Sequence, residues 1–177
     1  MKAIVITGAI LAAVVSQPFT AQAQQRFFAL TGEQYLRALR AQIDRNRALA
    51  PIPDLKCGRP IGSRHCQAEV TTSVRMSVSE SALDGNKLYE VAVNYDPRTG
   101  EPADGAVFDS ICAASIRVFR PKLSAAAASE RYRTALRRAT NAAPSSAAGI
   151  GKSTVKGKPD TFLVEVEPGR SISCKVT

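Results

Sequence analysis

The sequence predicts an α+β protein in which helices pack on one antiparallel sheet of four or five strands. Three observations lead to this fold class. Several segments alternate apolar and polar residues, as half-buried strands do. Three other segments repeat apolar residues at helical spacing, and together these segments give the order α-β-β-α-α-β-β. The chain also has four cysteines, an even number that predicts two disulfides in an exported protein.

The first predicted helix runs from Thr31 to about Leu49. Thr31 and Gln34 match the capping box, in which each side chain bonds the backbone N–H of the other residue. Apolar residues then recur at helical spacing, at Tyr35, Leu36, Leu39 and Ile43. Prolines at 51 and 53 end the helix.

Two alternating runs predict an antiparallel hairpin. The inward positions of the first run, 70–78, are Val70, Thr72, Val74, Met76 and Val78. The inward positions of the second run, 89–95, are Tyr89, Val91, Val93 and Tyr95. Asp84 and Gly85 form the turn between them.

Two helices follow the hairpin. Residues 105–120 predict the most buried helix, because apolar residues occupy a wide arc that includes Cys112. A second helix is predicted from Ser124 to Thr140, with alanines on its buried face and arginines elsewhere. The alanines allow close packing against a neighbour but bury only a modest apolar area.

The last strands are predicted at 161–167 and 172–176, with a short edge strand at 153–157. Gly151, Lys152 and Ser153 match the end of the phosphate-binding pattern G-x-x-x-x-G-K-[ST]. Position 146 is serine instead of the first glycine, and no strand pattern precedes the segment. Nucleotide binding is therefore not expected, because a phosphate loop joins a buried strand to a helix.

The cysteines allow three pairings, and sequence alone does not choose between them. We favour Cys57–Cys66, because these residues flank a short loop rich in glycine and proline. Cys112–Cys174 is then the second bond, between the most buried helix and the inward face of the last strand. A metal site is the less favoured alternative, since no C-x-x-C pattern is present and His65 is the single histidine.

The N-terminus has the layout of a secretory signal peptide. Lys2 precedes an uncharged apolar run, 4–15, and residues 21–23 form an A-x-A cleavage pattern. We expect cleavage near Ala23, which leaves residues 24–177 as one α+β domain in the periplasm or outside the cell. A retained membrane anchor is less favoured, because the run is shorter than the about 20 residues of a membrane span.

The chain is basic, with a net charge of +9. Removing residues 1–23, which contain one lysine and no acid, leaves +8. This charge favours an anionic partner such as lipopolysaccharide, lipid headgroups or an acidic protein. The predicted binding face consists of Arg117, Arg120, Arg131, Arg133, Arg137 and Arg138. Nucleic acid is disfavoured, because no aromatic residues alternate with these arginines. The alternative is a solvated surface without a partner.

The sequence offers little for catalysis, and no cofactor or metal is expected. Nucleophilic catalysis usually requires a base, but His65 lies between Arg64 and a cysteine expected to be oxidised. Hydrolysis by two carboxylates needs no histidine. The candidate carboxylates are Glu90, Asp96, Asp104, Asp109, Glu165 and Glu167. The favoured hypothesis is an exported, non-enzymatic binding or accessory module; the alternative is a small periplasmic hydrolase with an unidentified carboxylate pair.

Overall fold

The computed structural model describes residues 28–43, 51–58, 62–155 and 161–177. The helices in these ranges are α1 (Gly32–Ile43), α2 (Pro102–Phe119) and α3 (Ala125–Ala142). The strands are β1 (Lys56–Cys57), β2 (Ser63–Glu69), β3 (Val74–Ser81), β4 (Lys87–Tyr95), β5 (Gly151–Val155), β6 (Phe162–Glu167) and β7 (Ser171–Val176). Short 3-10 helices follow β3 and α3, at Ala82–Asp84 and Ala143–Ser145.

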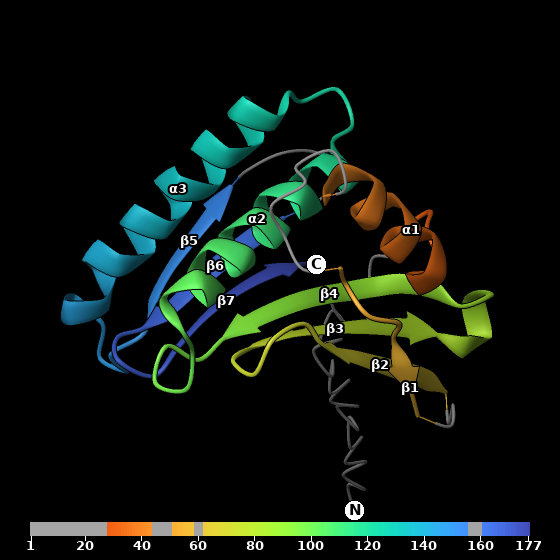
Figure 1. Cartoon of the computed structure of the whole chain (residues 1–177), viewed down its shortest axis with the longest axis horizontal. Helices are drawn as coiled ribbons and strands as arrows, with labels where there is room; N and C mark the ends of the chain where they lie inside the picture. The colour runs from red at the N-terminus through yellow and green to blue at the C-terminus, as the bar shows by residue number, and fades with distance from the viewer. Residues whose placement is uncertain (1–27, 44–50, 59–61, 156–160) are drawn as a thin grey trace, which may run out of the picture.

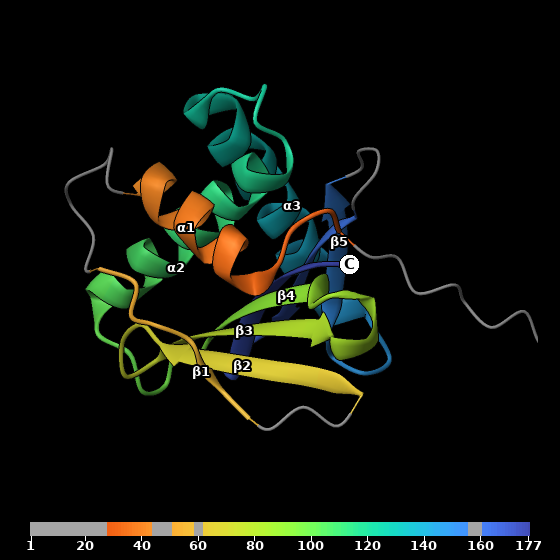
Figure 2. The same cartoon turned by 90° about the vertical axis from the view of Figure 1, so that its right-hand side faces the viewer.

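The strands form one antiparallel sheet in the order β1-β2-β3-β4-β7-β6-β5. The C-terminal strand β7 lies in the interior of the sheet, between β4 and β6. The three helices lie on one face of this sheet (Figures 1 and 2). This arrangement confirms the predicted class, helices on one antiparallel sheet.

Over the described ranges the sheet has seven strands instead of the predicted four or five, and the element order is α-β-β-β-β-α-α-β-β-β. The predicted strand at 70–78 is wrong at its start, because the chain turns at 70–73 and joins β2 to β3. The Thr71 hydroxyl accepts hydrogen bonds from the N–H groups of Ser73 and Val74 in this turn. Threonine suits both strands and side-chain-capped turns, so its presence does not separate the two.

The hairpin partner differs from the prediction at Tyr89. The register of β3 and β4 shifts between Ser79 and Glu80, so that Glu80 lies opposite Leu88. Leu88 is completely buried, whereas Tyr89 is half-exposed. A β-bulge inserts one extra residue and reverses the alternation beyond it, which a strict period of two does not anticipate.

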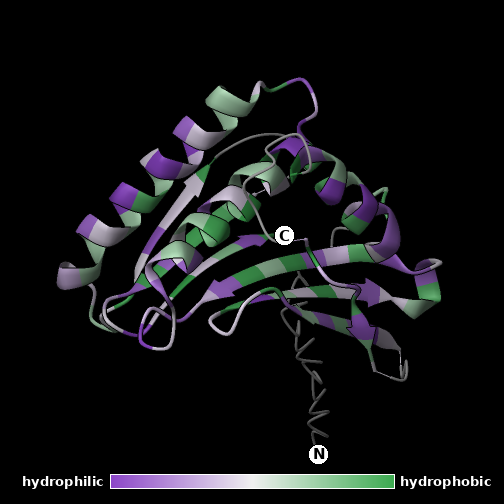
Figure 3. Cartoon of the chain, viewed as in Figure 1, coloured by the Kyte–Doolittle hydropathy of each residue, from purple (hydrophilic) through white to green (hydrophobic). Residues whose placement is uncertain are grey.

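Helix α2 is the buried centre of the fold, as its wide apolar arc predicts. Phe108, Ile111, Cys112 and Ile116 are at most 2% exposed. Helix α2 lies between α1 and α3 (Figure 1), and its ribbon is among the most hydrophobic parts of the structure (Figure 3). The second predicted helix corresponds to α3, whose buried residues are three alanines and Tyr132.

Both predicted disulfides are present. Cys57–Cys66 joins paired residues of β1 and β2 at one edge of the sheet. Cys112–Cys174 joins α2 to the interior strand β7, across a sequence separation of 62 residues. The covalent links thus act at one sheet edge and at the centre of the core.

The start of α1 confirms the predicted capping box. The N–H of Thr31 donates to Gln34 Oε1 at 2.9 Å, and the N–H of Gln34 donates to Thr31 Oγ1 at 3.3 Å. Helix α1 ends at Ile43 in the described residues. Residues 44–50, predicted to continue this helix, lie outside the described residues, as does the predicted signal peptide at 1–23.

Two buried tyrosines connect the helices. The Tyr132 hydroxyl on α3 donates to Asp109 Oδ1 on α2 at 2.8 Å. The Tyr35 hydroxyl on α1 shares a hydrogen bond of 2.7 Å with Ser115 Oγ on α2. Burial raises the pKa of both phenols well above the ordinary value, because it disfavours the charged phenolate.

Removal of the two disulfides is expected to destabilise the fold unequally. Cys112→Ala with Cys174→Ala will lower the free energy of unfolding by about 4 kcal/mol, since that bond closes the longer loop. Cys57→Ala with Cys66→Ala will lower it by about 2.5 kcal/mol, since its loop spans only 9 residues. Denaturant unfolding of both double variants measures the difference. A larger loss at Cys57–Cys66 would show that the α2–β7 bond is not the stronger constraint.

Alkaline pH is expected to destabilise the protein through Tyr35 and Tyr132. A pKa raised on folding gives stability that is present below about pH 10, the pKa of an unfolded tyrosine, and is lost as pH rises. Above that pH, each phenol should lower the free energy of unfolding by about 1.4 kcal/mol per pH unit. Tyr35→Phe with Tyr132→Phe should flatten the decline in unfolding free energy between pH 10 and 12, measured by urea titrations. The control is Tyr89→Phe, and equal slopes in all three proteins would refute the assignment.

Candidate functional site: a basic groove beside the open sheet edge

A groove of about 740 Å³ lies between helix α3 and strand β5. Strand β5 is the last strand of the sheet, and α3 runs alongside it (Figure 1). The groove is lined by Glu130, Arg131, Thr134, Ala135 and Arg138 of α3 and by residues 152–155 of β5. Its volume is within the usual range for ligand sites in proteins, about 300–1,000 Å³.

Gly151, next to the groove residue Lys152, brings strand β5 and helix α3 close together. A Cβ atom at this position would lie 1.7 Å from the carbonyl oxygen of Ala139 on α3. Only glycine allows so close an approach of two backbones. The glycine of the Gly-Lys-Ser segment therefore serves packing, and a strand instead of a helix begins there. This context does not fit a phosphate loop, which needs a helix N-terminus at that point.

The α3 wall of the groove presents two arginines. Arg131, Thr134, Ala135 and Arg138 have the spacing i, i+3, i+4 and i+7, so they share one helix face. Arg131 and Arg138 are exposed. Among the described residues, neither has a carboxylate within ion-pair distance, 4.0 Å. Their charges are thus available to a partner in the groove.

Glu130, the acid in the groove lining, is already paired. Its Oε1 lies 3.6 Å from Arg137 Nη2 and accepts a hydrogen bond of 3.3 Å from the Thr134 hydroxyl. Arg137 stands seven residues from Glu130, two helical turns along the same face. Arg137, which lies outside the groove lining, therefore offsets Glu130, and the two groove arginines have no ion-pair partner among the described residues.

Lys152 of β5 also lines the groove, but its side chain points to the face of the sheet opposite α3, because the neighbouring Gly151 faces α3. Its Nζ lies 2.6 Å from Glu165 Oε1, and Lys175 Nζ lies 2.8 Å from Glu165 Oε2. The hydrogen bonds from Lys152 and then Lys175 lower the pKa of the Glu165 carboxyl. One carboxylate is shared by two ammonium groups, so this cluster keeps a net positive charge.

The six arginines of the predicted binding face have different surroundings. Arg131 and Arg138 line the groove, whereas Arg137 contacts Glu130. Arg133 lies near Asp109, where burial raises the carboxyl pKa and the positive charge of Arg133 opposes part of that rise. The groove therefore contains two of the predicted arginines, together with Lys152, which sequence reasoning missed.

Arg117 of α2 and Arg120, which follows the last residue of α2, bind backbone carbonyls. Arg117 Nε donates to the carbonyl oxygen of Leu123 at 3.3 Å. Arg120 Nη2 donates to the carbonyl oxygen of Val155 at 3.1 Å. Arg120 thus ties the end of α2 to the end of β5, at the opposite end of the strand from Gly151. The contact of Gly151 with Ala139 and the hydrogen bond of Arg120 thus hold the groove strand at both ends.

Three of the candidate carboxylates are used in structural hydrogen bonds. Asp104 Oδ2 accepts from the Ser73 hydroxyl at 2.6 Å, which lowers the pKa of Asp104. Asp109 binds the Tyr132 hydroxyl, and Glu165 binds two lysines, as described above. Each carboxylate therefore has a role that stabilises the fold.

Asp96 and Glu167 line one cavity of about 520 Å³ at an end of the sheet. Arg98 makes two side-chain hydrogen bonds to Asp96 and holds the pKa of Asp96 at about 2. Arg170 lies 2.9 Å from Glu167. Hydrolysis by a carboxylate pair needs one acid whose pKa is raised toward neutrality, and Asp96 has the opposite shift. Glu90, the remaining candidate, is a half-buried residue of β4.

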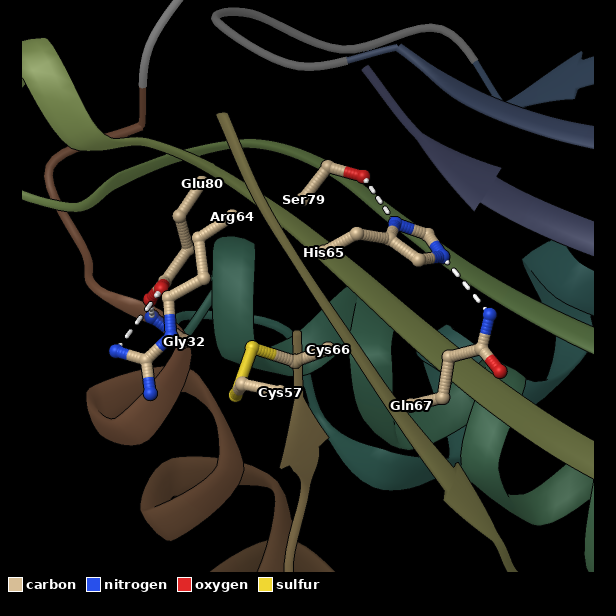
Figure 4. The surroundings of a disulfide bond; sticks show 8 residues. All are labelled: Gly32, Cys57, Arg64, His65, Cys66, Gln67, Ser79 and Glu80. Atoms are coloured by element: carbon tan, nitrogen blue, oxygen red, sulfur yellow. Dashed lines mark hydrogen bonds and ion pairs between the residues drawn. A yellow bond between two sulfur atoms is a disulfide. The ribbon is translucent and has the colours of Figure 1, made fainter. Parts of the chain in front are cut away.

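Both ring nitrogens of His65 have neighbours on the strands. Nδ1 lies 3.1 Å from Ser79 Oγ, and Nε2 lies 3.0 Å from Gln67 Nε2 (Figure 4). The adjacent Cys66 is bonded to Cys57 on the other side of the strand (Figure 4). A disulfide sulfur is not a thiolate, so this site offers no cysteine nucleophile for His65 to activate.

The groove geometry is expected to depend on Gly151. Gly151→Ala should lower the free energy of unfolding by about 2 kcal/mol or more, because the added methyl group must displace the α3 backbone at Ala139. Denaturant unfolding measures the loss. Gly58→Ala is the matched control, since its new Cβ would meet nothing closer than 3.9 Å. Equal losses in the two variants would contradict a specific role for the helix–strand contact.

The chain matches no protein family, no curated protein sequence and no solved structure. Within the described ranges, none of the helices combines the length and the apolar character that crossing a membrane requires. The features of the chain that bear on function are the charges on the groove walls and the backbone at the groove edge.

Proposed function

We propose that the mature chain is an exported, non-enzymatic binding module that holds an acidic partner in the groove between α3 and β5. The observation that carries this proposal is the pair Arg131 and Arg138, two exposed guanidinium groups on one groove wall with no described carboxylate in range. Guanidinium groups form charge-assisted, often bidentate hydrogen bonds with carboxylates and phosphates.

Export to the periplasm or the cell exterior is supported by two features. The first 23 residues have the pattern of a secretory signal peptide. All four cysteines are in disulfides, which persist in oxidising compartments and are rare in the reducing cytosol. An acidic partner would therefore be a component of the envelope or of the external medium.

A groove favours a narrow partner over a broad anionic surface. Lipopolysaccharide and lipid headgroups, also compatible with the net charge, would meet all exposed arginines of α3 alike. Arg131 and Arg138 instead share their recess with Thr134, Ala135 and the edge strand. A carboxylate hydrolase has less support, because arginines neutralise both acids of the cavity at the end of the sheet.

Binding of a fluorescein-labelled oligo-glutamate, followed by anisotropy across a salt titration, tests the proposal. Arg131→Gln with Arg138→Gln should weaken binding at least about tenfold, since each lost charge-assisted contact is worth about 1 kcal/mol at a partly exposed site. The matched control is Arg37→Gln with Arg133→Gln, which removes the same charge from positions outside the groove lining and should change affinity less than about twofold.

Two results would contradict the proposal. Equal losses in the two double variants would mean that net charge attracts the probe without any role for the groove. Absence of binding by the unmodified protein at low salt would remove the acidic partner altogether, because electrostatic attraction is strongest there.

A further inference from the structure

The backbone of β5 has groups that point to the open edge of the sheet. Thr161 and Thr177 exchange both backbone hydrogen bonds, so the backbone groups of Phe162 point away from β7 and toward Val155 of β5. By the same alternation, the backbone groups of Gly151, Ser153 and Val155 form hydrogen bonds with β6. The N–H and C=O groups of Lys152 and Thr154 therefore face the open edge.

These edge groups are accessible and rigidly held. Lys152 and Thr154 are exposed, and within the described ranges no backbone or side-chain hydrogen bond reaches their edge-facing groups. The strand is fixed at one end by the contact of Gly151 with Ala139, and at the other by Arg120. The opposite sheet edge, β1, is only two residues long. Strand β5 is thus the edge suited to pair with another strand.

The α3 wall stands where the side chains of an added strand would point. On the groove side of such a strand, successive side chains are about 6.8 Å apart. Arg131 and Arg138 are separated by about 10.5 Å along the helix axis. Arginine side chains are long enough to make up the difference between this distance and the spacing of side chains on the added strand. Thr134 and Ala135 lie between them and are small. Acidic side chains at alternate positions would therefore reach both arginines.

We infer that the groove binds an extended acidic segment of a protein partner, which adds to β5 as an eighth strand. This inference rests on the proposed function and names the partner. The added backbone hydrogen-bonds Lys152 and Thr154, and its alternate carboxylates bind Arg131 and Arg138, which is the β-augmentation mode of peptide recognition. A second copy of this chain fits less well, because its own edge carries Lys152 and like charges repel.

Thr154→Pro tests the pairing without altering any charge. Proline is tolerated at an edge position whose N–H faces solvent, so the fold should be kept. The variant lacks the N–H that the added strand needs. The probe is a labelled eight-residue peptide of alternating glutamate and valine, whose affinity should fall at least about tenfold. Thr154→Val, which keeps the N–H and removes only the hydroxyl, is the matched control and should bind within about twofold of the unmodified protein.

A second measurement applies if the proline variant does not fold. The same peptide, N-methylated at alternate amides, is titrated against the unmodified protein in both methylation phases. One phase should bind at least about tenfold more weakly than the other, because only one set of amides faces β5.

The outcomes separate this inference from the proposed function. Unchanged peptide affinity in Thr154→Pro, or equal affinities of the two methylated peptides, would overturn strand pairing. If the Arg131→Gln, Arg138→Gln variant still lost affinity in that case, the acidic groove would stand. A third outcome concerns the partner. If the peptide does not bind, but phosphatidylglycerol vesicles bind with an affinity that depends on those arginines, the inferred protein partner would be wrong and a lipid headgroup would take its place.

Discussion

Helix α2 is tied to the middle of the sheet by Cys112–Cys174, and the other helices pack against this unit. The bond joins the most buried helix to an interior strand, so the two layers of the fold keep a fixed relation. Helix α3 is held to α2 by the hydrogen bond from Tyr132 to Asp109. Arg120, directly after α2, also holds the groove strand through its hydrogen bond to the carbonyl of Val155. The groove therefore depends on the same core that stabilises the fold.

In the part of the chain that the structure describes, the groove combines a sheet edge without a paired strand with arginines that have no ion-pair partner. Exposed edges invite unwanted pairing, and proteins often protect them with lysine. Lys152 at the edge of β5 disfavours pairing between two copies of the chain, because their like charges would repel. The same positive charge would favour an acidic strand. The nearby acids do not cancel the charge, because Glu130 is paired with Arg137 and Glu165 is shared by two lysines. In the proposed mode of binding, selection between partners would follow from charge as well as from shape.

Much of the fold could be predicted from the sequence, and the failures have local causes. The wide apolar arc of α2 and the inward position of Cys174 predicted the helix and its disulfide, because burial dominates both. The turn at Thr71 and the bulge that buries Leu88 were missed, since both interrupt a pattern of period two. Helical spacing separates Arg131 and Arg138 from the other arginines of α3, but placing Lys152 beside them requires knowing that β5 ends the sheet. That position follows from long-range strand pairing.

Amide hydrogen exchange of the isotope-labelled protein, followed by NMR with and without the alternating glutamate–valine peptide, tests the central claim most directly. Bound peptide should slow exchange at the amides of Lys152 and Thr154, which face the open edge, and shift the side-chain signals of Arg131 and Arg138. Two results would contradict the claim that the groove recognises an acidic strand. At saturating peptide, exchange at both amides would be unchanged, or the shifted signals would belong to residues elsewhere on the sheet.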